Sequence, residues 1–79
     1  MKLKFKDYSY TVEELRNKRN QLVAKIYTKQ GISILKDIKG RKLGSYDSKE
    51  NKTRDVSGVL VGYGNWLVAL LFDNKDLLI

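Results

Sequence analysis

Residues 35–46, LKDIKGRKLGSY, can be laid over residues 53–64, TRDVSGVLVGYG, at an offset of eighteen positions. In both stretches an aspartate is followed three positions later by one glycine and seven positions later by another. The matched residues are Asp37 with Asp55, Gly40 with Gly58, and Gly44 with Gly62. An aspartate that opens a tight turn can accept hydrogen bonds from backbone amides, and a glycine three positions on can adopt the positive φ that closes a short hairpin. The repeat therefore predicts two copies of one β-hairpin.

Outward from these hairpins, the chain from about 25 to 64 is predicted to be an antiparallel meander of short strands. Gly31 marks a further turn, and the polar residues 47–52 read as a connecting loop. Hairpins fix which strands are neighbours, but the strand order stays open because an N-terminal strand can pair with either edge.

The N-terminal part predicts a strand and then a helix. Residues 2–6, KLKFK, alternate with a period of two, which is typical of an edge strand whose exposed lysines protect it against aggregation or bind phosphate. Thr11 and Glu14 have the spacing of a capping box. The apolar residues that then recur at helical spacing are Val12, Leu15, Leu22 and Ile26. An amphipathic helix is therefore expected from Thr11 to about Tyr27.

The C-terminal part is strongly apolar. Residues 66–72 form either a short helix capped by Asn65 or a strand, and we favour the helix. Residues 77–79, LLI, either pack under the sheet or meet a second subunit. The candidate oligomer or partner interface consists of Trp66, Leu70, Phe72, Leu77 and Ile79. Together these expectations describe one α+β domain over residues 1–79.

The recurring unit, KDIKGRKLGSYD and then TRDVSGVLVGYGN, resembles the hairpin repeat of the small bacterial proteins called four-fold beta-flower proteins. The resemblance covers about residues 32–65, and this chain shows two clear repeats where the family name implies four. It implies radial packing of hairpins and no established activity. No functional residue is carried over from it.

Composition argues against catalysis. The chain has no histidine and no cysteine, which removes thiolate nucleophiles, the usual zinc ligands and the side chain best suited to proton transfer near neutral pH. We expect no enzyme, no metal site and no cofactor. No apolar segment follows the basic start, and the longest apolar run, residues 66–72, is far shorter than the roughly 20 residues of a membrane span. A cytoplasmic location is expected.

Charge is unevenly distributed along the chain. The formal net charge is +7, and residues 1–54 carry fifteen basic and six acidic side chains. Such a field favours polyanions, although it also keeps a small protein soluble. Lysines and arginines interleave with tyrosines, a mixture that suits nucleic acid because cations neutralise phosphates and rings stack on bases. The candidate nucleic-acid-binding residues are Arg16, Lys18, Arg19, Lys36, Lys39, Arg41 and Lys42.

Three functions are consistent with these features of the sequence. The first is a small basic binding module that contacts the phosphate backbone of nucleic acid, because no sequence signature of a base-reading domain is present. The second is a regulator or inhibitor, encoded by a phage or mobile element, that binds a host protein, for instance an acidic or a nucleic-acid-handling one. The third is a structural homo-oligomer built on the apolar C-terminal residues.

Overall fold

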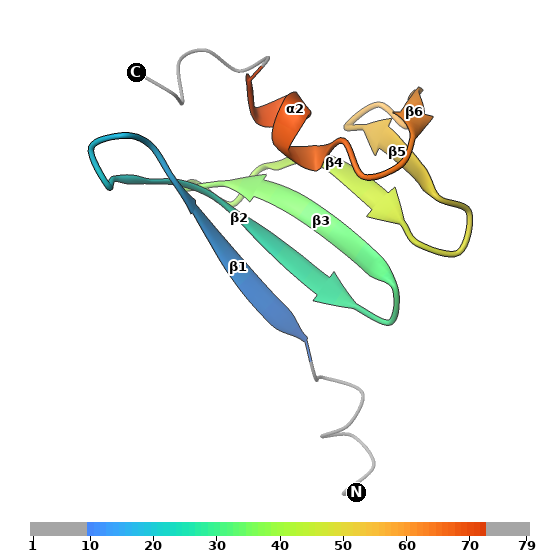
Figure 1. Ribbon diagram of the computed structural model, residues 1–79, viewed down its shortest axis with the longest axis horizontal. Helices are drawn as coiled ribbons and strands as arrows, with labels where there is room; N and C mark the ends of the chain where they lie inside the picture. The colour runs from blue at the N-terminus through green and yellow to red at the C-terminus, as the bar shows by residue number, and fades with distance from the viewer. Residues whose placement is uncertain (1–9, 73–79) are drawn as a thin grey trace, which may run out of the picture.

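The computed structural model describes residues 10–72, which form one antiparallel sheet and one short helix (Figure 1). Every strand pairs with the next one along the chain, so the sheet is a simple meander with the order β1-β2-β3-β4-β5-β6. The strands are β1 (Thr11–Arg16), β2 (Leu22–Lys29), β3 (Ile32–Asp37), β4 (Lys42–Asp47), β5 (Lys52–Asp55) and β6 (Leu60–Tyr63), and the helix is α2 (Leu67–Phe72). The predicted edge strand at residues 2–6 and the apolar residues 77–79 lie outside the described residues.

The predicted amphipathic helix from Thr11 to Tyr27 is wrong, and with it the α+β fold class: the structure is mostly a β-meander. This segment forms the hairpin of β1 and β2. Asn17 closes it, because its Oδ1 accepts the backbone N–H groups of Arg19 (2.9 Å) and Gln21 (3.0 Å). Asn20 takes a left-handed φ of 65°. Asparagine suits both positions, since its side chain can bond the local backbone and tolerates the left-handed region.

The two hairpins predicted from the repeat are present, and their turns use the expected chemistry. Oδ1 of Asp37 accepts the amides of Lys39 and Arg41, each at 2.9 Å. Asp55 does the same for the two equivalent amides of its own turn. Gly40 and Gly58 have φ values of 85° and 88°. The Asn17 turn shares both features, a side-chain oxygen that accepts two amides and a positive φ three residues later, so it is a third copy of the motif.

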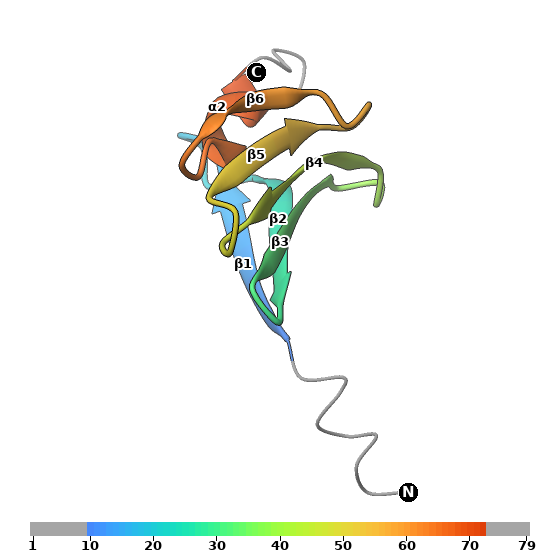
Figure 2. The same ribbon diagram turned by 90° about the vertical axis from the view of Figure 1, so that its right-hand side faces the viewer.

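Each of the three hairpins also has one bulge in its returning strand. In the first, Leu15 pairs with Ala24 and Arg16 pairs with Leu22, so Val23 is the extra residue. The equivalent shifts in the other two hairpins leave out Leu43 and Val61. Because a bulge bends its strand and increases the local twist, three of them help to curve the sheet (Figure 2).

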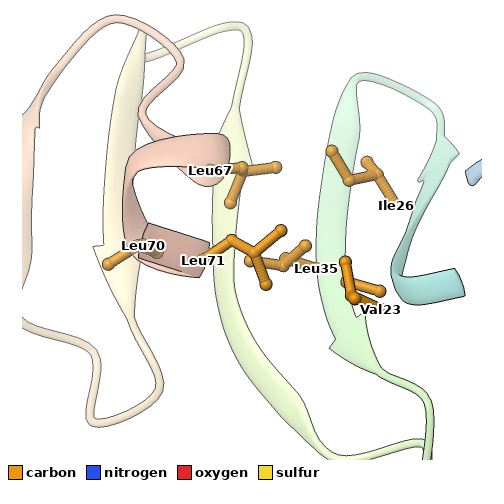
Figure 3. Close-up of a cluster of buried hydrophobic side chains, with 7 residues drawn as sticks. Val23, Ile26, Leu35, Leu67, Leu70 and Leu71 are labelled. Atoms are coloured by element: carbon orange, nitrogen blue, oxygen red, sulfur yellow. The ribbon is translucent and has the colours of Figure 1, made fainter. Parts of the chain in front are cut away.

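The core lies between α2 and one face of the sheet. The helix lies over β4, and Leu67 and Leu71 point toward the side of Leu35 on β3 and Val23 on β2 (Figure 3). Leu70 points the other way in this view, and its side chain lies against Gly44 on β4. The buried apolar side chains are Val23, Ala24, Ile26, Leu35, Leu67, Leu70 and Leu71. Of the two alternatives for the apolar C-terminal segment, the structure shows the helix, over residues 67–72. Asn65 Oδ1 accepts the amide of Leu67 at 3.1 Å, which is the capping contact predicted for Asn65.

A buried threonine joins the helix to the sheet. Thr53 on β5 is fully buried, and its Oγ1 donates to the carbonyl of Gly64 at 2.6 Å and accepts the amide of Trp66 at 2.9 Å. One hydroxyl thus satisfies two backbone groups of the segment that leads into α2. This contact fixes where the helix begins relative to β5.

We predict that Gly44→Ala lowers the free energy of unfolding by about 1–3 kcal/mol, as measured by urea denaturation. A Cβ at Gly44 would collide with the Leu70 side chain and lie 2.8 Å from the carbonyl oxygen of Arg54. The control is Gly40→Asn, where the space is open and the first hairpin has Asn20 at the equivalent position. Equal losses in the two variants would contradict the role of Gly44 in seating α2.

Candidate nucleic-acid interface

Three lysines lie side by side on the face of the sheet opposite α2. Lys25 on β2 pairs directly with Lys36 on β3, and Lys36 pairs with Lys42 on β4. Their strand neighbours Ile26 and Leu35 point into the core, so alternation directs Lys25 and Lys36 to the other face. No described element lies over this face (Figures 1 and 2). We call Lys25, Lys36 and Lys42 the lysine row.

The lysine row is costly for the fold. Like charges directly opposite each other on neighbouring strands are destabilising, and lysine is depleted in strands generally. Lysines on edge strands protect against aggregation, but β2, β3 and β4 are interior strands. Two members of the row are partly compensated: Lys25 has Glu14 directly opposite on β1, and Nζ of Lys36 lies 5.2 Å from the centroid of the Tyr27 ring. Protection of an edge therefore does not explain the row.

A strip of apolar side chains runs beside the lysine row. Tyr27 pairs with Val12 on one side and with Ile34 on the other, and these three residues form the tyrosine strip. The Tyr27 ring also contacts the ring of Tyr10, with centroids 6.2 Å apart and planes tilted by 51°. On the far side of the strip lies Lys29, two residues along β2. The face thus presents aromatic and aliphatic groups between cations.

Lys36 and Lys42, predicted from charge alone, belong to the lysine row. Lys18 and Arg19, predicted to lie on a helix, instead occupy the turn between β1 and β2. Lys39 lies in the turn between β3 and β4. In a meander these two turns leave the sheet at the same end, and the lysine row lies near that end. The predicted cations therefore lie near one end of the sheet, but not all on one face. Lys18 and Arg19 line a pocket together with residues of α2, on the helix side, whereas Lys36 and Lys42 belong to the uncovered face.

Two of the predicted arginines have partners inside the protein. Arg16 Nη2 pairs with Glu14 Oε1 at 2.9 Å, and its Nη1 donates to the carbonyl of Asn20, also at 2.9 Å. Arg41 Nε pairs with Asp37 Oδ2 at 2.7 Å. These contacts hold the first and second turns in shape. Arg16 and Arg41 thus have a structural role in addition to their charge.

The ion pair at Asp37 affects titration. Asp37 has a fully buried side chain, whereas Arg41 is mostly exposed. Burial by itself raises the pKa of the Asp37 carboxyl, but the amide and guanidinium of Arg41 and the amide of Lys39 outweigh it, so that the pKa lies below the ordinary value of 3.8. Asp37 therefore stays ionised in the folded protein at neutral pH.

Sequence reasoning missed Lys25 and Tyr27 as site residues because it placed them at the end of a helix. The signal was present, since residues 25–29, KIYTK, alternate with a period of two. Only the pairing of β2 with β3 shows that Lys25 faces Lys36.

The apolar candidates for an interface divide into two groups. Leu70 is buried in the core, so its side chain packs inside the protein. Trp66 is 49% exposed and Phe72 is 60% exposed. The Trp66 indole is oriented because its Nε1 donates to the carbonyl of Tyr63 at 2.6 Å. Leu77 and Ile79 lie outside the described residues.

Comparison of the chain with protein-family models, curated proteins and solved structures found no match. The resemblance to the beta-flower repeat stays a prediction. Within residues 10–72, the one helix is far too short to cross a membrane, and no three carboxylates gather closely enough to hold a metal ion.

We predict that Lys42→Gln raises the free energy of unfolding at low salt by a few tenths of a kcal/mol up to about 1 kcal/mol, because it removes one end of the repulsive row. Lys42 is preferred to Lys36 because it lacks the contact with the Tyr27 ring. The control is Lys49→Gln in the turn between β4 and β5. Added salt should reduce the difference through screening. A loss of stability in Lys42→Gln at low salt would contradict the proposed repulsion.

A second prediction concerns acid stability. The folded pKa of Asp37 is lower than the ordinary value of 3.8 that applies to the unfolded chain, so its contribution to stability is present above that pH and is lost as pH falls through the folded pKa. Asp37→Asn keeps the Oδ1 acceptor but removes the charge. It should flatten the fall in the free energy of unfolding below about pH 4, and Arg41→Gln should do so in part. Urea titrations across that range measure the slope, and an unchanged slope in Asp37→Asn contradicts the assignment.

Proposed function

We propose that this protein is a non-enzymatic module that binds nucleic acid through the phosphate backbone, with the lysine row as the main contact. The observation that carries the proposal is the direct pairing of Lys25, Lys36 and Lys42 on interior strands. Their repulsion costs stability, and a bound polyanion removes that cost by neutralising the charges. An anionic ligand therefore accounts for the part of the repulsion that Glu14, opposite Lys25, and Tyr27, beside Lys36, do not offset.

Binding of this kind is driven mainly by counterion release. Each phosphate that a lysine or arginine neutralises frees condensed cations, so affinity falls as salt rises. Lys18, Arg19 and Lys39, in turns at the same end of the sheet, extend the positive field beyond the lysine row. Such contacts position a backbone without reading base sequence. We therefore expect weak dependence on nucleotide sequence.

A second candidate function is binding of a host protein, and the third hairpin favours it. Val56 and Val59 in its turn are each 61% exposed. β6 is an edge strand without a charged residue, and Trp66 lies exposed beside it. Unpaired edges and exposed apolar groups are typical of surfaces that pair with another chain. This surface is separate from the lysine row, so the two candidates can be tested independently.

The test of the proposed function is fluorescence anisotropy with a labelled oligonucleotide at about 50 mM and about 200 mM salt. Two triple variants remove the same charge: K25Q/K36Q/K42Q changes the lysine row, and K18Q/R19Q/K39Q changes the turns. The row variant should bind more weakly than the turn variant. For a single strand it should also reduce the slope of log affinity against log salt by about 2, from three lost phosphate contacts.

Each other outcome has a definite meaning. Equal losses in the two triple variants would show that net charge alone determines binding. A larger loss in the turn variant would place the contact at the turns and not on the face. Absence of binding by the unaltered protein at about 50 mM salt, where non-specific contacts are strong, would overturn the proposal. An acidic or apolar protein partner would then become the leading candidate.

A further inference from the structure

We propose that the nucleic acid bound by this face is single-stranded, with its bases stacked on Tyr27 and its backbone along the lysine row. The inference rests on the proposed function and makes it more specific. It starts from the tyrosine strip, where Tyr27 on β2 lies between Val12 on the edge strand β1 and Ile34 on β3. Phosphate contact alone leaves this strip without a role.

The chemistry of the strip distinguishes single strands from duplexes. In a duplex the faces of the bases are stacked on one another, and a protein meets phosphates and base edges. In a single strand the base faces are available and stack on aromatic side chains, which adds affinity with little sequence preference. A flat ring flanked by aliphatic groups therefore complements a single strand and contributes little to a duplex.

The spacing of the two rows fits the same ligand. Neighbouring strands are about 4.8 Å apart, so the lysine row spans roughly 10 Å across β2, β3 and β4. Lys25 and Tyr27 are two residues apart on β2, which separates the cations from the ring by about 6.7 Å along the strand. A backbone that follows the lysines thus has its bases beside the strip. Such a platform suits a segment on the order of four nucleotides.

Lys36 links the two rows. Its Nζ lies over the Tyr27 ring, 5.2 Å from the centroid. A base stacks on that side of the ring when the Lys36 ammonium moves from the ring to a phosphate. The same pairing recurs on this face, where Nζ of Lys52 lies 5.9 Å from the ring of Tyr63. Tyr63 is 65% exposed and directly opposite Lys52 across β5 and β6. Two lysine–tyrosine pairs therefore occupy the same face.

The experiment compares three ligands with equal label and length at about 50 mM salt. The first is a single-stranded oligothymidine of about twelve nucleotides, within the site sizes of sheet-based single-strand binders. The second is the matching duplex, and the third is an abasic strand that has the same phosphates and no bases. The unaltered protein should bind the oligothymidine more tightly than the duplex, and about fivefold or more tightly than the abasic strand.

Variants at Tyr27 then locate the stacking contact. Tyr27→Leu should weaken binding of oligothymidine by about fivefold or more and leave binding of the abasic strand unchanged, which also shows that the variant is folded. Tyr27→Phe keeps the ring and should bind like the unaltered protein. If Tyr27→Leu fails to fold, the comparison of ligands with the unaltered protein still decides the question.

Failure of this inference differs from failure of the proposed function. Equal binding of the oligothymidine and the abasic strand, or tighter binding of the duplex, would overturn single-strand stacking and leave phosphate binding intact. Tyr27→Leu with unchanged affinity for oligothymidine would overturn the assignment of Tyr27. Absence of binding to all three ligands would overturn both proposals.

Discussion

A side-chain oxygen that accepts two backbone amides closes each of the three hairpins that share one end of the sheet, and the rest of the fold depends on it. Asn17, Asp37 and Asp55 supply this oxygen, and a residue with positive φ follows three positions later in each turn. The turn sets the pairing of the two strands and therefore the bulge in the returning strand. Because the same unit occurs three times, one local interaction determines most of the meander.

The repeat of aspartate and glycine made the second and third hairpins predictable, because those residue types have few other uses at that spacing. The first hairpin was missed for a physical reason. Asn17 takes the role of the aspartate and Asn20 that of the glycine. The turn has the same hydrogen bonds and backbone conformation as the other two, although its residue types differ. The apolar residues of this segment fit helical spacing as well as strand alternation. Pairing of β2 with β3, which local sequence does not show, selects the strand.

The candidate site was predictable only in part. Charge along the chain pointed to Lys36 and Lys42, which lie on the uncovered face. It could not place Lys25 beside them, because that requires the register of β2 against β3, and the sequence pattern assigns residue 25 to the end of a helix. Charge also did not separate these lysines from Arg16 and Arg41, which make ion pairs within turns. The sequence gives the type of each surface residue, but its neighbours across the sheet depend on how the strands pair.

The two faces of the sheet contribute to stability in opposite ways: one is closely packed, and the other carries like charges that repel. One face seats α2, and its close fit needs a glycine at position 44. The other face keeps three lysines paired with one another on neighbouring interior strands, although a domain this small has little stability to spare. A ligand that binds only the folded state stabilises it, and an anionic one also relieves the repulsion within the lysine row. If the proposed function holds, stability and binding are coupled through the same side chains: substitutions that reduce the repulsion stabilise the free protein and weaken its binding of a polyanion.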